Sequence, residues 1–256
     1  CLNLDGVIAV MLYGRYGRLG VEIMQSVFRD LALEQNEASL FAVKEAVALL
    51  PQDHPLHSYI SMAPDLQFDA GIVDTFLHGR DRSYTVADCL DLVASAGLIF
   101  QDWYLKSSYY PPTPPGGGFY AAVAALPEAQ QWSVMERINT RNACHFFTAC
   151  HADRAPESYR VDFASPTILD AAPTFRYRCG FDGSSIYRPG WRMNLDLEQR
   201  TIVQLIDGHR TIREIVEAVA QLGVPAPQRQ VELQNRARLL LQSLWQQDFL
   251  AMVLGS

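Results

Sequence analysis

Four side chains with charged or hydrogen-bonding groups mark the end of the first apolar run. The run, VIAVMLY, ends at Tyr13 and is followed by Arg15, Tyr16 and Arg18. Ligands of open α/β sheets bind beyond the carboxyl ends of the strands. If the run is a strand, these four side chains are candidates for binding a substrate. The alternative is that both arginines cap a helix or pair with acids such as Glu22, and the sequence leaves the two open.

Two histidines, His54 and His57, lie with Asp53 in a polar segment that predicts a loop. A histidine near a transferring group can act as a general base for an oxygen or nitrogen nucleophile. His54 and His57 are therefore the candidate catalytic residues, although an exposed loop histidine without a catalytic role is more common. An alanine replacement of both is the direct test.

The segment CHFFTACHA places Cys144, His145, Cys150 and His151 close together, as in a metal site. On a regular strand, 144 and 150 share one face while 145 and 151 share the other, so four ligands do not converge. We therefore predict core cysteines and no metal. The segment 109–118, YYPPTPPGGG, predicts a loop because of its prolines and glycines. Its two tyrosines, Tyr109 and Tyr110, can line a pocket or cover the edge of the sheet.

The elements that position these residues follow an α/β pattern up to about residue 154. The run that ends at Tyr13 has no alternation, which is typical of a central parallel strand that is buried on both faces. Thr85 is a good N-cap and Gly97 a stop for the helix between them. The expected helices are two within 21–50, broken around 34–38, then 70–77, 86–96 and 119–139 with an interruption near Pro127; loops are expected at 51–69 and 109–118, and further strands at 98–105 and 144–152.

Beyond Asp153 the sequence becomes polar and rich in Arg and Pro, and it becomes periodic again only from Leu197. Three helices and a closing strand are expected there, with Gly208 and Gly223 at helix ends. This arrangement predicts a small, mostly α winged-helix-like domain. We divide the chain into an α/β domain at 1–154, an irregular linker at 155–196 and this domain at 197–256.

The composition argues against a nucleic-acid partner, because the chain of 256 residues has a formal net charge of −7 and its Lys residues are only Lys44 and Lys106. No apolar run approaches the about 20 residues of a membrane span. Five widely spaced cysteines are an odd number, which favours reduced thiols and a cytoplasmic protein. The chain opens at Cys1 and reaches a core strand within six residues, so we expect it to be the C-terminal fragment of a longer protein.

Three segments carry a family resemblance. LDGVIAVMLYGRYGR resembles the fifth strand of class I S-adenosylmethionine-dependent methyltransferases, DRSYTVADCLDLVASAGLIFQDWY resembles their following helix and sixth strand, and CHFFTACHAD is similar to their antiparallel seventh strand. The resemblance covers about residues 2–154. It implies the C-terminal part of a Rossmann-like sheet, strands five to seven, on the acceptor side of a methyltransferase.

The methyl donor, S-adenosylmethionine, is held in this family by a Gly-rich turn after the first strand and an acidic residue at the end of the second. No G-x-G-x-G follows a strand here, and the glycines at 116–118 follow four prolines instead. The resemblance therefore places the cofactor-binding residues upstream of Cys1. In the family the fifth strand lies between the fourth and the seventh, so the edge of the strand at 7–13 would be unpaired and prone to association.

The C-terminal segment, from IVQLIDGHRTIREIVEAVAQLG to LLLQSLWQQDFLAMVL, resembles PqqD-like and related winged-helix tails of bacterial enzymes. Such tails often bind a peptide or protein partner, and some winged helices bind DNA. Here Arg229, Arg236 and Arg238 face Glu232 and many glutamines in the expected long helix, which is little positive charge for a duplex.

Together these features predict a fragment of a methyltransferase that supplies the acceptor side and a regulatory or partner-binding tail, and that is inactive alone. The acceptor is not identified by the sequence. The alternative is a non-enzymatic protein that binds a peptide or protein through the winged-helix-like tail on a degenerate sheet. A regulator that uses the tail on DNA is a third possibility, which a strongly salt-dependent duplex affinity would support.

Overall fold

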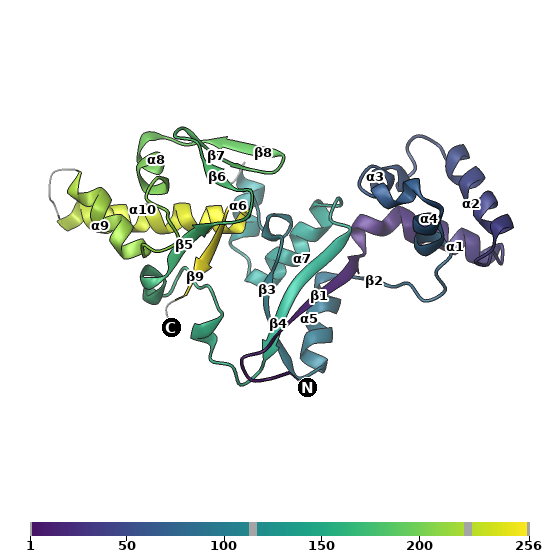
Figure 1. Ribbon diagram of the computed structural model, residues 1–256, viewed down its shortest axis with the longest axis horizontal. Helices are drawn as coiled ribbons and strands as arrows, with labels where there is room; N and C mark the ends of the chain where they lie inside the picture. The colour runs from purple at the N-terminus through teal and green to yellow at the C-terminus, as the bar shows by residue number, and fades with distance from the viewer. Residues whose placement is uncertain (1, 113–116, 223–226, 255–256) are drawn as a thin grey trace.

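The computed structural model describes residues 2–112, 117–222 and 227–254. Figure 1 shows a small β-sheet in the middle of an elongated molecule, with helices α1 to α4 at one end and the C-terminal elements at the other. Within the described ranges, no helix is long and apolar enough to cross a membrane.

The central sheet has four strands in the order β2-β1-β4-β3. They are β1 (Val7–Gly14), β2 (Ser83–Tyr84), β3 (Leu98–Trp103) and β4 (Cys144–His151). The strand β4 runs antiparallel to both β1 and β3, while β1 and β2 are parallel. The three long strands predicted from the sequence are thus confirmed, as is the antiparallel pairing of the first with the last.

Helices cover one face of this sheet. The helices α5 (Val86–Ser95) and α7 (Glu128–Ile138) pack with Phe147 and Ala149 of β4 and with Val10 and Leu12 of β1. The opposite face carries Met11 and Phe146, which are 48% and 39% exposed and lie opposite each other in the β1–β4 register.

The prediction that β1 is buried on both faces is therefore wrong for the described chain. Val7, Ile8 and Met11 are 42–48% exposed. The edge of β1 has a strand partner only at Tyr13 and Gly14, where β2 pairs with it, as far as the described residues go. An apolar run without alternation indicates only that its side chains are suited to burial. Among the described elements, none covers the side chains of Val7, Ile8 and Met11.

Residues 19–77 form a helical unit with its own hydrophobic cluster, which includes Val21, Phe28, Val43, Leu56 and Phe76. The two helices expected within 21–50 are confirmed, and the side chain of Asn36 caps the second by accepting the Ser39 N–H. The segment predicted as a loop contains a short helix and a 3-10 turn, because Leu56 and Tyr59 are buried in this cluster. The helices are α1 (Leu19–Asp30), α2 (Glu37–Leu49), α3 (Leu56–Ile60) and α4 (Asp69–Phe76).

Local signals fix the ends of the next helices. Thr85 and Asp88 form a reciprocal capping box at the start of α5, and Gly97 follows the helix with a φ of +68°. The interruption expected near Pro127 is confirmed, since it separates α6 (Gly118–Ala124) from α7. Short 3-10 helices complete the structure at η1 (Tyr16–Arg18), η2 (Pro64–Gln67), η3 (Lys106–Ser108), η4 (Pro156–Ser158) and η5 (Pro166–Asp170).

The segment 155–196 is not irregular throughout, which corrects the description of it as an irregular linker. It contains β5 (Ala172–Phe175), β6 (Gly180–Phe181), β7 (Ser185–Arg188) and β8 (Trp191–Asn194). The last three form an antiparallel sheet, and β5 pairs with β9 (Leu250–Val253) at the end of the chain. Strands this short, interrupted by turns, give little periodicity to detect in a sequence.

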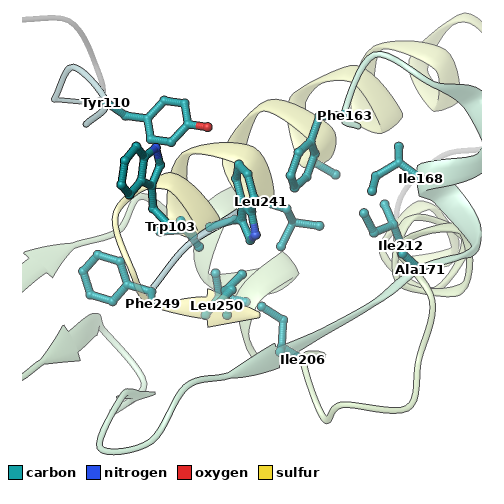
Figure 2. Close-up of a cluster of buried hydrophobic side chains, with 14 of the residues drawn as sticks. Trp103, Tyr110, Phe163, Ile168, Ala171, Ile206, Ile212, Leu241, Phe249 and Leu250 are labelled. Atoms are coloured by element: carbon teal, nitrogen blue, oxygen red, sulfur yellow. The ribbon is translucent and has the colours of Figure 1, made fainter. Parts of the chain in front are cut away.

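The C-terminal part contains the three expected helices, α8 (Leu197–Val203), α9 (Ile212–Gln221) and α10 (Pro227–Gln246), and the expected closing strand, β9. Gly208 has a φ of +81°, whereas Gly223 lies outside the described residues. Figure 2 shows Phe163, Ile168 and Ile212 near Leu241 of α10. The same hydrophobic cluster includes Trp103 of β3, so it runs from the central sheet into the C-terminal helices. The domain limits themselves stay a prediction.

Candidate acceptor site at the end of β1

The carboxyl end of β1 meets the end of β2 and the loop before β4 in very close contact. A Cβ atom on Gly14 would lie 2.7 Å from the carbonyl oxygen of Asn142, and one on Gly17 would lie 2.3 Å from the same atom. Real side chains do not fit at such distances, so glycine is required at both positions. The Arg15 N–H donates to the Tyr84 carbonyl at 2.9 Å, which joins the two strand ends.

Arg18 is buried here as a structural tie and is only 1% exposed. Its guanidinium pairs with Asp81 and stacks on the ring of Tyr13, 3.6 Å from the ring centroid. Gln25 of α1 donates to the same Asp81 carboxylate at 2.9 Å. Of the two alternatives left by the sequence, the structure thus gives Arg18 an acid partner, Asp81 and not Glu22. The residue joins the sheet to the helical unit.

The other three candidates lie nearer the surface. Arg15 is exposed and makes no ion pair within the described part of the chain, while Tyr13 and Tyr16 are half-buried. Arg15 and Tyr16 are therefore the members of the group that can reach a molecule above the sheet. Their role in binding a substrate stays a prediction.

Below this edge lies a buried polar network that the sequence analysis did not assign to a site. The Nε2 atom of His145 is 2.9 Å from the Tyr84 carbonyl, which can only accept, so Nε2 carries the proton. The Nδ1 atom then accepts from the Tyr109 hydroxyl at 2.7 Å. That hydroxyl in turn accepts from the Asn142 amide at 2.9 Å. His145 is thereby fixed as one neutral tautomer.

Glu136 of α7 completes the network. Its carboxylate accepts the Val86 N–H at 3.0 Å and lies 3.8 Å from Nε2 of His145. Burial raises the pKa of Glu136 to about 7, while burial lowers the pKa of His145. Below about pH 7 the network therefore favours the uncharged forms of both groups, and it can then hold the strand end in place without a buried charge.

Aromatic packing secures Tyr109 in this network. Its ring stacks on Trp103 with centroids 3.9 Å apart and planes at 15°. Burial raises the pKa of the Tyr109 hydroxyl far above its ordinary value, so it stays protonated. Tyr109 thus lies under the sheet edge as a fixed hydrogen-bonding group, and Tyr110 donates separately to Glu128 at 2.6 Å. The sequence showed two tyrosines before prolines but gave no signal for their partners.

The two candidate histidines belong to the start of α3. Nδ1 of His54 accepts the Leu56 N–H at 3.2 Å, and Nε2 of His57 lies 3.0 Å from the Pro51 carbonyl. The start of α3 packs on Gly20 of α1, where a Cβ would lie 2.3 Å from the Leu56 nitrogen. Both rings thus have local structural partners, and their catalytic role stays a prediction. Nothing in the described ranges groups three or more His, Cys, Asp or Glu side chains as a metal site.

The residues described at this edge do not fit the methyl donor implied by the sequence resemblance. Dinucleotide-type sites need a Gly-rich turn after a strand, so that the backbone can approach the ligand, and an acidic residue for the ribose. Here β1 continues into Arg15–Arg18 and β3 into Tyr104–Ser108. Gly117 is the N-cap of α6 and Gly118 is its first residue, and neither directly follows a strand within the described ranges. We therefore derive no donor site from these residues.

Comparisons with known proteins give a structural match. No protein-family model matches the chain. Among solved structures, the fold is similar to PKMT2 from Rickettsia typhi, a methyltransferase, with a TM-score of 0.59 and 11% identity over 98% of this chain. A structure of PKMT2 in complex with AdoHcy gives a TM-score of 0.58 at 11% identity over all of this chain. At this identity, the shared feature is a methyltransferase-like α/β fold.

The chain spans only about half the length of PKMT2, 52% and 54% in the two structures.

Proposed function

We propose that the chain is the acceptor half of an S-adenosylmethionine-dependent methyltransferase, with a winged-helix-like, partner-binding C-terminal module. The observation that carries the proposal is the strand order β1-β4-β3 with β4 antiparallel, which is the order expected for strands five, seven and six of that fold. The match to a methyltransferase that was solved with AdoHcy supports it.

The donor half belongs at the free edge of β1 in this proposal. On the side of β2, the edge of β1 has no described strand partner before Tyr13, and the apolar side chains Val7, Ile8 and Met11 along this strand are half-exposed. An edge of this kind pairs with another strand. A neighbouring parallel strand and its crossover helix would cover both this edge and the bare face at Met11 and Phe146. The methyl donor and the acceptor then both lie around the carboxyl end of β1, where Arg15 and Tyr16 are accessible.

In this proposal the residues of this chain position the methyl acceptor, and the donor half binds S-adenosylmethionine. Arg15 and Tyr16 contact the acceptor, while Arg18 and the Tyr109–His145 network fix the strand end from below. Methyl transfer depends mainly on alignment of the two reactants, so a rigid edge is the contribution that matters. A general base is needed only for a weakly nucleophilic acceptor, and His54 and His57 are the residues we assign to it.

Calorimetric binding of S-adenosylhomocysteine tests the proposal. The two samples are the 256-residue chain and the same chain extended by the polypeptide encoded directly upstream of the Cys1 codon. We expect binding by the extended protein only. Binding by the 256-residue chain, or the lack of an upstream reading frame that restores binding, would contradict the division into halves.

A further inference from the structure

A second free strand edge of the central sheet borders a cleft. A cavity of about 400 Å³ lies between β3, the segment 158–161 and the C-terminal strand β9. Its walls include Gln101 to Tyr104 on one side and Leu250 to Met252 on the other. Successive side chains of a strand point to opposite faces, so consecutive lining residues mean that the strand edges themselves border the cleft.

Neither of these edges has a strand partner in the described residues. Within the ranges that the structure describes, β3 pairs only with β4, and β9 pairs only with β5. The neighbouring N–H groups of Tyr159 and Arg160 donate to the Pro156 carbonyl in their own turn. At Trp103 the backbone is already engaged by side chains, because its N–H donates to Asp102 at 2.8 Å and its carbonyl accepts from Lys106. The open part of the outer edge within the described residues is therefore the stretch before it, Leu98 to Gln101, which has no strand partner on that side.

Gln101 adds an independent observation, since its Oε1 atom is buried and has no hydrogen-bond partner in the described structure. Its side chain lines both the cleft and an adjoining pocket of about 170 Å³. A buried acceptor that lacks a donor is unfavourable, and such groups call for an explanation. A ligand that brings an N–H to this position satisfies it.

The charged groups of the cleft are held rigidly. Lys106 donates to Asp102 at 2.7 Å and to the Trp103 carbonyl at 2.9 Å, and its ammonium lies 4.8 Å from the Trp245 ring centroid. Arg176 pairs through one nitrogen with Asp248. A wall of paired charges and fixed aromatic rings is preorganised, which lowers the entropic cost of binding.

The adjoining pocket fits a side chain. It is lined by the aromatic residues Tyr110, Trp132 and Trp245 and by Glu128. One oxygen of Glu128 accepts the Tyr110 hydroxyl at 2.6 Å. An open backbone edge with a pocket beside it is the arrangement by which domains bind peptides as an added strand.

We propose that the cleft binds an extended peptide segment, which adds a strand to the outer edge of β3 and gives Gln101 its missing donor. The site rests on the proposed function in one respect, since the C-terminal module supplies Trp245 and Leu250 to its wall. It lies on the opposite edge of the sheet from β1 and needs no donor half. The open stretch of β3, Leu98 to Gln101, is about 13 Å long at about 3.3 Å per residue, so about four residues of a bound peptide can pair with it.

A positional-scanning library of fluorescent hexapeptides with blocked ends, applied to the 256-residue chain, tests the proposal by anisotropy. We expect a selected peptide to bind, and its copy with N-methylated alternate backbone nitrogens to bind at least about tenfold more weakly, because each lost backbone hydrogen bond contributes about twofold to tenfold. Equal binding of both peptides means that they are held by their side chains and not as an added strand, and it overturns the proposal, as does the absence of any bound peptide.

Two variants locate the site. Gln101→Arg fills the cleft with a longer side chain, and we expect it to weaken the selected peptide at least about tenfold with the melting temperature unchanged. The matched variant Met11→Arg changes the other free edge and should bind the peptide normally. If Met11→Arg loses binding and Gln101→Arg keeps it, the peptide pairs with β1 and the proposal is wrong.

Discussion

The two free edges of one small sheet differ in chemistry. At β1 the half-exposed residues are Val7, Ile8 and Met11. At β3 the edge faces a cleft with Gln101, Lys106 and Asp102 in its wall. Permanent interfaces resemble a protein core, whereas ligand sites combine apolar walls with a few fixed polar groups. The difference supports the two proposals, a lasting partner at β1 and an exchangeable one at β3.

The largest expected effect lies at the end of β1. Arg18→Ala leaves Asp81 and Gln25 around a buried space without their cation, and removing one partner of a buried pair costs about 3–5 kcal/mol of unfolding free energy. Urea denaturation followed by circular dichroism measures it. The control is Arg213→Ala, whose pair with Asp170 is about half-exposed and should cost less than about 1 kcal/mol. Similar losses in the two variants would show that Arg18 is not the tie that we infer.

The second effect concerns association through β1. We expect the 256-residue chain to self-associate at this edge, and the double variant Ile8→Lys with Met11→Lys to weaken association about hundredfold. Burying two such side chains contributes about 3 kcal/mol or more, and like charges oppose pairing. Sedimentation velocity over a range of concentrations measures it. Gln101→Lys at the other edge is the control, and a monomeric parent chain would remove the contrast between the edges.

These two edges also show how far the sequence can be interpreted. The apolar run predicted β1, because an apolar pattern is a local property of the sequence, and the family resemblance predicted its antiparallel partner. The edge expected to be unpaired is paired by β2 at Tyr13 and Gly14. Exposure was not predictable, since it depends on which other elements are present. The partner of Arg18 is Asp81, which lies 63 positions away, and nothing in the local pattern around Arg18 selects it.

The cleft at β3 was missed for a related reason. Its walls come from β3, the segment around Tyr159 and the last strand, which are separated by about 60 to 150 positions. The polar residues in 155–196 indicated a linker, although this segment supplies β5, the partner of β9. Likewise, His145 was recognised as a strand residue, but its role depends on Tyr109 and Tyr84, which only the folded chain brings together.

The pH dependence of the unfolding free energy tests whether the buried network around Glu136 stabilises the end of β1. The pKa of Glu136 is raised to about 7 from 4.5, so the folded state holds its proton more tightly. Stability from this group is complete below about pH 4.5 and is lost as the pH rises to about 7, by about 3 kcal/mol in all. Glu136→Gln keeps an acceptor for Val86 but cannot ionise, so the difference in unfolding free energy between parent and variant should change by this amount over that window.

His145 does not obscure this measurement. Its lowered pKa makes the folded state less stable as the pH falls below its ordinary value near 6.5, which is the opposite sign. The residue is present in both proteins, so its direct contribution cancels in the difference. A flat difference between pH 4.5 and 7 would mean that Glu136 is solvated and that the strand end is held without it.

The smallest effect distinguishes a binding residue from a structural one at β3. Gln101→Leu replaces a buried acceptor that has no partner in the described structure by an apolar group of similar size. We expect the unfolding free energy to stay the same or to rise by up to about 1 kcal/mol, because the cost of the unpaired oxygen is removed. Peptide affinity should fall in the same variant. A residue whose replacement weakens ligand binding without destabilising the fold is retained for binding. A loss of stability in Gln101→Leu would instead mean that the amide supports the sheet edge and that the cleft needs no ligand to complete it.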